Sequence, residues 1–201
     1  MSGKQSGLRR AVALLATGLP LLACTLSAPA ADPAAGRDKA QICVACHGAG
    51  GNSVNPAVPS LAGQPNQFIA TQLVMFREGN RKDPQMSPFA ANLTNTDLRD
   101  LAAYFSSQPL APSARGTDPA NAAAGRRLTE QYHCVSCHGP ALAGQQHIPR
   151  LAGQQFDYLR TQLQGFKAGT RFDMDGNMTS AARALTVTDI EILADYLAGL
   201  K

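Results

Sequence analysis

Tryptophan is absent from this sequence, and aromatic residues make up only 5% of its 201 residues. The hydrophobic fraction is ordinary at 44%, and the length allows one domain or two small ones. Small domains with so few aromatic side chains need another large apolar body to complete the core. The composition therefore predicts that a bulky group from outside the polypeptide fills part of the interior.

The sequence also lacks a large excess of positive or negative charge. The formal net charge is +4, but Lys4, Arg9 and Arg10 lie in an N-terminal segment that we expect to be removed. The rest of the chain holds 15 basic residues against 14 acidic ones. No basic patch stands out, which argues against nucleic acid as a partner.

The N-terminal apolar run, from Ala11 to Leu22, is shorter than the roughly 20 residues that a membrane-spanning helix needs. It follows the positive residues and precedes Ala28-Pro29-Ala30, which fits a cleavage site, so residues 1–30 are predicted to be an export signal peptide. An alternative is a lipoprotein signal, because Leu21-Leu22-Ala23-Cys24 resembles a lipobox and lipidation at Cys24 would anchor the protein. Either route delivers the chain to the periplasm.

Four of the five cysteines form two copies of the motif Cys-x-x-Cys-His, 91 positions apart. The members are Cys43, Cys46 and His47 in the first copy, and Cys134, Cys137 and His138 in the second. This spacing is the attachment signature of c-type haem, in which two thiols bond the porphyrin and the histidine lies under the iron. A bare Cys-x-x-Cys also occurs in redox disulfides and zinc sites, but neither requires the histidine that follows here twice. The sequence therefore predicts two covalently bound haem c groups.

From Asp32 onward the chain repeats itself with an offset of 90 to 92 residues. The clearest match is Pro59-Ser-Leu-Ala-Gly-Gln64, which returns as Pro149-Arg-Leu-Ala-Gly-Gln154. The repeat predicts two domains, at residues 31–108 and 122–201. Three prolines in residues 109–121 predict an extended linker between them.

Apolar spacing predicts three helices in each repeat, so the expected fold class is all-α. The expected ranges are 36–45, 66–77 and 95–106 in the first repeat, and 123–136, 156–167 and 187–198 in the second. Thr94 with Asp97, and Thr186 with Asp189, resemble capping boxes at the start of the third helices. The apolar stripes of these two helices are expected to be core: Leu98, Leu101, Ala102 and Phe105, and Ile190, Leu193, Ala194 and Leu197.

The ligand opposite each histidine separates electron transfer from oxygen chemistry. Met86 and Met178 each lie seven residues before a matched leucine of the repeat, in stretches that we expect to be loops. Thioether ligation raises the reduction potential and leaves no open site on the iron, which suits electron transfer. We predict both methionines as axial ligands; the alternative is that they pack against haem without binding the iron.

Four other side chains are weaker candidates for an axial ligand. Met174 competes for the second iron but has no counterpart in the first repeat, and Met75 lies on an apolar helix face and is expected in the core. His133 abuts the second haem motif, and His147 aligns with Ala57, a position that needs no ligand. We expect both histidines on the solvated surface.

On these residues the chain resembles the dihaem cytochromes of the cytochrome c4 family. The likeness covers about residues 35–201, including both haem motifs, both Pro-x-Leu-Ala-Gly-Gln stretches and both methionine regions. It implies two tandem cytochrome c-like domains, with His47 and Met86 on one iron and His138 and Met178 on the other. It also implies that the carbonyls of Pro59 and Pro149 accept hydrogen bonds from the two histidines. One departure is a loop before Met178 that is two residues longer.

The resemblance further implies a periplasmic carrier, often loosely membrane-associated, within a respiratory chain. Its redox partners would be a donor such as a quinol–cytochrome c reductase and an acceptor such as a terminal cytochrome oxidase. No motif places a nucleophile or an acid–base pair, so the chain is predicted to be a carrier and not an enzyme. Two alternatives stay open: a dihaem electron-accepting subunit of a flavin or quinoprotein dehydrogenase, and a dihaem peroxidase, which needs one exchangeable iron ligand and two unlike haems.

Overall fold

The structure is a computed structural model that describes residue 3 and residues 30–111 and 115–201. Residues 31–201 form one compact unit. The predicted export signal and Cys24 lie outside the described residues, apart from residues 3 and 30. Among the helices of the described ranges, none is long and apolar enough to cross a membrane.

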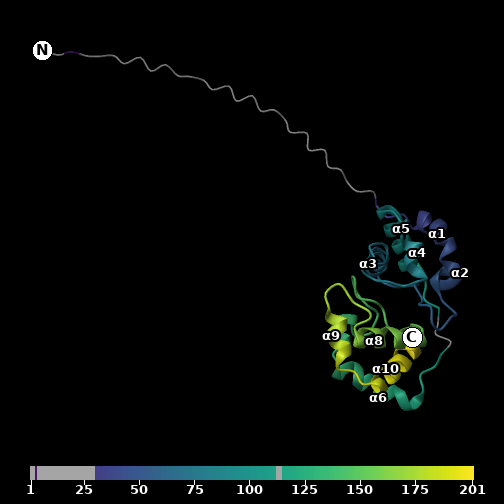
Figure 1. Ribbon diagram of the computed structural model, residues 1–201, viewed down its shortest axis with the longest axis vertical. Helices are drawn as coiled ribbons and strands as arrows, with labels where there is room; N and C mark the ends of the chain where they lie inside the picture. Colours follow the sequence, from purple (N-terminus) through teal and green to yellow (C-terminus); the bar gives the residue numbers. More distant parts are fainter. Residues whose placement is uncertain (1–2, 4–29, 112–114) are drawn as a thin grey trace. The chain divides into compact units, whose positions relative to one another are not determined.

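The described chain is helical, and its two repeats contain the same succession of helices (Figure 1). The helices of the first repeat are α1 (Pro33–Lys39), α2 (Val44–His47), α3 (Asn66–Arg77), α4 (Met86–Ala90) and α5 (Asn95–Ser107). Those of the second are α6 (Pro119–Gln131), α7 (Cys134–His138), α8 (Phe156–Ala168), α9 (Asn177–Arg183) and α10 (Val187–Gly199). Two short 3₁₀ turns, Ala40–Ile42 and Ala49–Gly51, flank α2. Within the described ranges the only extended pairing is a single bridge between Gln145 and Ile148, which confirms the all-α prediction.

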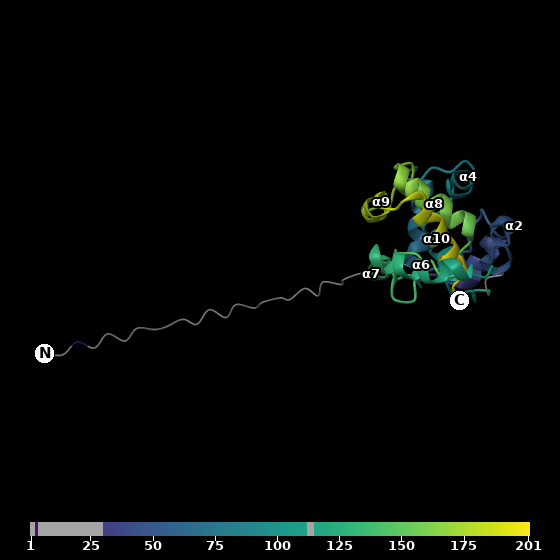
Figure 2. The same ribbon diagram turned by 90° about the horizontal axis from the view of Figure 1, so that it is seen from below.

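The packing scheme is also repeated (Figures 1 and 2). The first helix of each repeat lies against the last, α1 on α5 and α6 on α10. The last helix also contacts the middle one, α3 or α8, which in turn contacts the short helix α4 or α9. The haem motif follows the first helix and the predicted methionine ligand lies in the short one, so this packing sets where both lie.

A glycine at each crossing allows the first and last helices to touch. A β-carbon on Gly36 would overlap the backbone of Asp100, and a β-carbon on Gly125 would overlap the side chain of Tyr196. Both glycines are buried. The close approach therefore depends on the missing side chain.

The third helices begin and pack as the sequence predicts. Thr94 and Asp97 form a capping box at the start of α5, and Thr186 and Asp189 form one at the start of α10. All eight residues of the predicted apolar stripes are buried. These helices were predictable because both signals, the cap and the stripe, are local in sequence.

The prediction of an unbroken helix into each haem motif is wrong. In the first repeat the helix tightens into the 3₁₀ turn Ala40–Ile42 before α2 begins. In the second, His133 adopts a left-handed conformation with φ of 55° and separates α6 from α7. Asp118 caps α6 and Pro119 opens it, so this helix starts inside the range predicted to be a linker.

The two repeats contact each other through their matching Leu-Ala-Gly-Gln stretches. The side-chain amide of Gln64 accepts from the N–H of Arg150 and donates to its carbonyl, each at 3.0 Å. Gln154 makes the same two bonds to Ser60, at 2.8 and 2.9 Å. The contact therefore has the reciprocal pattern of a twofold interface, built between two halves of one chain.

A second contact between the repeats brings two arginines, Arg81 and Arg171, to one glutamine side chain. Arg81 donates to Oε1 of Gln162 at 3.0 Å and to the hydroxyl of Tyr158 at 3.3 Å, and Arg171 donates to the same oxygen of Gln162. Burial lowers the pKa of Arg171 to about 10. Burial alone would raise the pKa of Tyr158, but the charges of Arg81 and Arg171 outweigh it and lower that pKa.

Candidate haem sites

The first haem motif lies on the short helix α2. Cys43 immediately precedes this helix, and its carbonyl accepts the N–H of His47 at 3.0 Å. Positions three and four apart share one face of a helix, so the two thiols and the imidazole can address one bound group. Cys46 is exposed, Cys43 is half-buried and His47 is only 5% exposed.

The second motif has the same arrangement on α7. Cys137 is exposed, Cys134 is half-buried, and His138 is 3% exposed. Each repeat therefore offers one inner thiol, one outer thiol and one buried imidazole. None of the four described cysteines is in a disulfide, so all four thiols are free to form thioether bonds.

Each buried histidine is held by a proline carbonyl, as the resemblance implied. Nδ1 of His47 lies 2.8 Å from the oxygen of Pro59, and Nδ1 of His138 lies 2.8 Å from the oxygen of Pro149. A carbonyl oxygen only accepts, so Nδ1 carries the proton and Nε2 has its lone pair free. Burial lowers the pKa of both imidazoles although the proline carbonyls oppose the shift, so the neutral, metal-binding form is favoured.

The thiols do not have the character of a redox dithiol. Burial raises the pKa of Cys43 and of Cys134, whereas reactive dithiols depend on a lowered thiol pKa. Within the described ranges, no group of three or more His, Cys, Asp and Glu side chains could hold a metal ion, and a structural zinc needs four ligands. The two alternatives to haem that the bare Cys-x-x-Cys left open thus find no support in these residues.

The predicted methionine ligands occupy matching places, but those places are helices. Met86 is the first residue of α4 and Met178 the second of α9, so the prediction that both lie in loops is wrong. An aspartate precedes each helix and accepts the methionine N–H at 2.8 Å, from Asp83 in the first repeat and from Asp173 in the second. Both methionines are half-buried.

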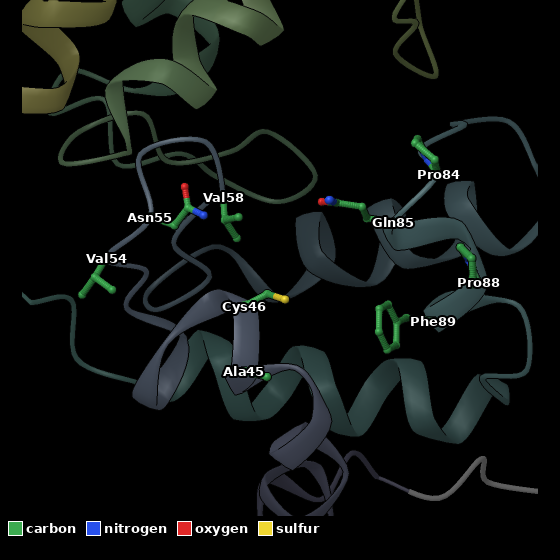
Figure 3. Close-up of a pocket in the computed structure, with 9 residues that line it drawn as sticks. All are labelled: Ala45, Cys46, Val54, Asn55, Val58, Pro84, Gln85, Pro88 and Phe89. Atoms are coloured by element: carbon green, nitrogen blue, oxygen red, sulfur yellow. The ribbon is translucent and has the colours of Figure 1, made fainter.

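A cavity of about 560 Å³ opens between α2 and α4 in the first repeat. Its walls include Cys46 on one side and Gln85, Pro88 and Phe89 on the other (Figure 3). The sulfur of Cys46 points into the open space (Figure 3). An apolar cavity that one attachment cysteine faces, beside the helix that carries Met86, fits a haem group.

Of the other candidate ligands, Met75, His133 and His147 lie where the sequence predicts. Met75 is buried, at 5% exposed, and belongs to the core. His133 and His147 are exposed, and Met174 is 74% exposed. None of these four side chains is placed like Met86 and Met178, which lie in the first turn of matching short helices in the two repeats.

Comparison with known proteins agrees with this geometry. The family model described as "Cytochrome c" matches residues 122–201, and that described as "Cytochrome C oxidase, cbb3-type, subunit III" matches residues 31–105. The chain is 40% identical to cytochrome c4 of Thiocapsa roseopersicina over 84% of this chain and 93% of that protein. This chain belongs to the cytochrome c4 family. It is therefore a dihaem electron-transfer protein with two covalently bound haem c groups.

A solved structure and a further relative extend the likeness. The crystal structure of reduced recombinant cytochrome c4 from Pseudomonas stutzeri matches with a TM-score of 0.80 and 36% identity, over 86% of this chain and all of that one. A protein of Thiomonas intermedia named "Thiosulfate dehydrogenase electron acceptor" is 36% identical over 95% of this chain and 91% of its own length. Relatives of this chain thus carry names for more than one redox setting.

Sequence reasoning missed the polar residues that join the repeats. Gln64 and Gln154 lie in the repeated motif, but nothing local in the sequence tells that each reaches the other repeat. Arg81 and Arg171 follow two residues after the matched glycines Gly79 and Gly169, so extending the repeat comparison would have found them. Their recurrence at the same offset was the available signal.

Proposed function

We propose that this chain is a periplasmic electron shuttle of a respiratory chain. It would accept electrons from a donor such as a quinol–cytochrome c reductase and pass them towards a terminal cytochrome oxidase. The observation that supports it most is the duplication of one arrangement: a buried histidine held by a proline carbonyl, with a methionine in the first turn of a short helix in each repeat. Two irons without an open position suit electron transfer and not oxygen or peroxide chemistry.

In this proposal His47 and Met86 bind one iron, and His138 and Met178 bind the other. Cys43 and Cys46 hold the first haem by thioether bonds, and Cys134 and Cys137 hold the second. The haem groups supply the one-electron chemistry once they are bound. The carbonyls of Pro59 and Pro149 orient the imidazoles and raise their basicity towards the iron.

The short helices α4 and α9 have a positioning role for the methionines. Asp83 and Asp173 each fix the backbone N–H of one methionine, and α4 and α9 pack against the long helices α3 and α8. A thioether held this way keeps its place in both oxidation states. Little then rearranges when an electron arrives or leaves, which favours fast transfer.

The ligand assignment is tested on oxidised holoprotein matured in a bacterial periplasm. Haem is counted per chain, and the weak long-wavelength absorption band of a ferric iron–methionine bond is quantified. Two haems with the band intensity of two such bonds agree with closed sites in both repeats. Two haems with half that intensity mean that one iron has another ligand or an open site, which would overturn the assignment and reopen the peroxidase alternative.

A second function is favoured by one finding, the likeness to a thiosulfate dehydrogenase electron acceptor. The chain would then be the electron-accepting subunit of a periplasmic dehydrogenase. Purification of the untagged holoprotein from its own periplasm separates the two functions. A free monomer that reduces oxidase-containing membranes supports the shuttle, whereas a fixed ratio with a larger flavin or quinoprotein subunit supports the second function.

A further inference from the structure

One peptide group connects each proximal histidine to the opposite repeat. The carbonyl of Pro59 accepts the Nδ1–H of His47 at 2.8 Å. The N–H of Ser60 belongs to the same peptide group, and it donates to Oε1 of Gln154 at 2.8 Å. A continuous chain of hydrogen bonds therefore runs from a histidine of the first repeat to a glutamine of the second.

An equivalent chain of hydrogen bonds starts from the histidine of the second repeat. The carbonyl of Pro149 accepts the Nδ1–H of His138 at 2.8 Å. The N–H of Arg150, in the same peptide group, donates to Oε1 of Gln64 at 3.0 Å. Each repeat thus supplies one glutamine to the histidine of the other.

The side chains at the two ends of each chain of bonds are buried. His47, Ser60 and Gln154 are 5%, 5% and 6% exposed. In the second chain, His138 and Gln64 are each 3% exposed. Hydrogen bonds that water cannot replace polarise one another more strongly than exposed ones do.

We propose that Gln154 tunes the reduction potential of the haem in the first repeat, and that Gln64 tunes that of the haem in the second. The glutamines act through the Pro59–Ser60 and Pro149–Arg150 peptides and touch neither haem ligand. They are positioning residues for the electron-transfer function. The proposal depends on the two haem groups and on His47 and His138 as ligands, but not on which partner the protein serves.

The direction of the effect follows from elementary polarisation. When Ser60 N–H donates to Gln154, the Pro59 carbonyl becomes a stronger acceptor. A stronger acceptor draws the Nδ1 proton away from the His47 ring and makes Nε2 more basic. A more electron-rich ligand stabilises ferric over ferrous iron, so the glutamine lowers the potential.

The arrangement makes the interrepeat contact part of both redox sites. If the repeats moved apart, both peptide groups would lose their glutamine acceptor at the same time. Both potentials would then rise. A partner that loosens this contact would therefore change the driving force for electron transfer without touching either haem ligand.

The test uses dihaem holoprotein with Gln154→Leu and Gln64→Leu, each of which removes one amide. The two potentials are followed by NMR during redox titration, with each haem assigned by contacts to residues of its own repeat. Gln154→Leu is expected to raise only the first repeat's potential, and Gln64→Leu only the second's. Cooperative strengthening is about 10–30% per bond, so the equilibrium constant for reduction of the affected haem should change by roughly twofold, while that of the other haem stays constant.

The potential measurements are combined with a spectroscopic readout and a matched control variant. The Nδ1–H signal of His47 should shift in Gln154→Leu, while that of His138 should stay in place. Gln155→Leu is the control, because its side-chain amide donates across the same contact to the carbonyl of Ser53 at 2.6 Å and to the hydroxyl of Ser60 at 3.5 Å, but does not bond the Pro59–Ser60 peptide group. The bonds of Gln154 to the N–H and carbonyl of Ser60 do not involve the Gln155 side chain. This variant is expected to leave both potentials unchanged.

Three results would overturn the proposal. One is that each glutamine variant changes the reduction potential of the haem in its own repeat and not that of the haem in the other repeat. Another is that Gln155→Leu raises the first potential as much as Gln154→Leu does, which would indicate general loosening. The third is that neither glutamine variant moves any potential. If Gln154→Leu does not fold, Gln154→Asn, which shortens the reach by one methylene, and the independent Gln64→Leu decide the outcome.

Discussion

Gly36 lies so close to Asp100 that no side chain fits between α1 and the backbone of α5. The carboxylate of Asp100 also accepts the N–H of Asp32 at 2.9 Å and pairs with Lys39 at 2.7 Å, so both ends of α1 are tied to α5. In the second repeat the buried Asp195, at another position of the last helix, accepts the N–H of Asp118 at 3.0 Å. In both repeats a buried aspartate of the last helix therefore holds the start of the helix before the haem motif.

This crossing predicts the effect of Gly36→Ala. The new β-carbon would overlap the Asp100 carbonyl, and since backbone cannot rotate away, α1 must shift. We expect the holoprotein to lose about 2–3 kcal/mol of unfolding free energy, measured by urea unfolding followed by far-UV circular dichroism. Gly116→Ala is the matched control, because a β-carbon there meets nothing within 4 Å. Equal stability of the two variants would mean that the close crossing does not hold α1.

A second prediction concerns Met86→Ala. Loss of the thioether leaves an open or water-bound iron, so we expect one of the two reduction potentials to fall by on the order of 0.1 V while both haems stay attached. Spectroelectrochemical titration measures both potentials in one experiment. The control is Met75→Leu, which alters a buried methionine that belongs to the core. Superimposable titration curves for Met86→Ala and the parent would refute the ligand assignment.

The sequence predicted most of the long helices because their signals are local. α3 spans the expected Asn66–Arg77, and α5 starts at the expected Asn95 because Thr94 and Asp97 cap it. The break before α7 was not predictable, since His133 adopts a left-handed backbone although nothing in its neighbourhood marks it as a turn. The short helix α4 was missed because it contains Pro88, yet a proline in the first turn of a helix removes no intrahelical hydrogen bond.

The haem motifs could be assigned from sequence because their chemistry lies within five consecutive residues. The methionines remain a prediction from sequence, which rests on the alignment of Met86 with Met178 in the two repeats. The hydrogen bonds between repeats could not be predicted in this way. Gln64 and Arg150 are 86 positions apart, and only the fold places the amide of one against the backbone of the other.

A third prediction follows from the pKa of Asp97. Hydrogen bonds from the Thr94 hydroxyl, from Lys39 and from the Thr94 N–H lower this pKa from 3.8 to about 2. A lowered pKa in the folded state means that the carboxylate stabilises the fold at pH values above 3.8, and that this contribution disappears as the pH falls towards 2. Asp97→Asn should therefore cost about 1–2 kcal/mol at neutral pH, and the difference from the parent should shrink over that acid range.

Urea unfolding of the parent and Asp97→Asn at neutral pH and at several acid values checks this prediction. Asp38→Asn serves as the control, because Asp38 is 82% exposed and its nearest cation, Arg37, is 4.0 Å away. Its effect on stability should be small at every pH. A difference between Asp97→Asn and the parent that stays constant through the acid range would contradict the role of the Asp97 charge.

A fourth prediction concerns the dependence of each repeat on its haem. The contiguous core cluster of the first repeat contains five buried residues, whereas that of the second contains eleven. The buried apolar residues of the first repeat are less contiguous, so we expect this repeat to depend more on its haem. Cys43→Ser with Cys46→Ser should therefore give a one-haem protein whose first repeat is poorly folded. The matched double variant, Cys134→Ser with Cys137→Ser, should lose less helix, since eleven buried residues can still pack together. Haem staining and far-UV circular dichroism of both purified variants measure the effect, and a stable, fully helical first repeat without haem would show that its core needs no such group.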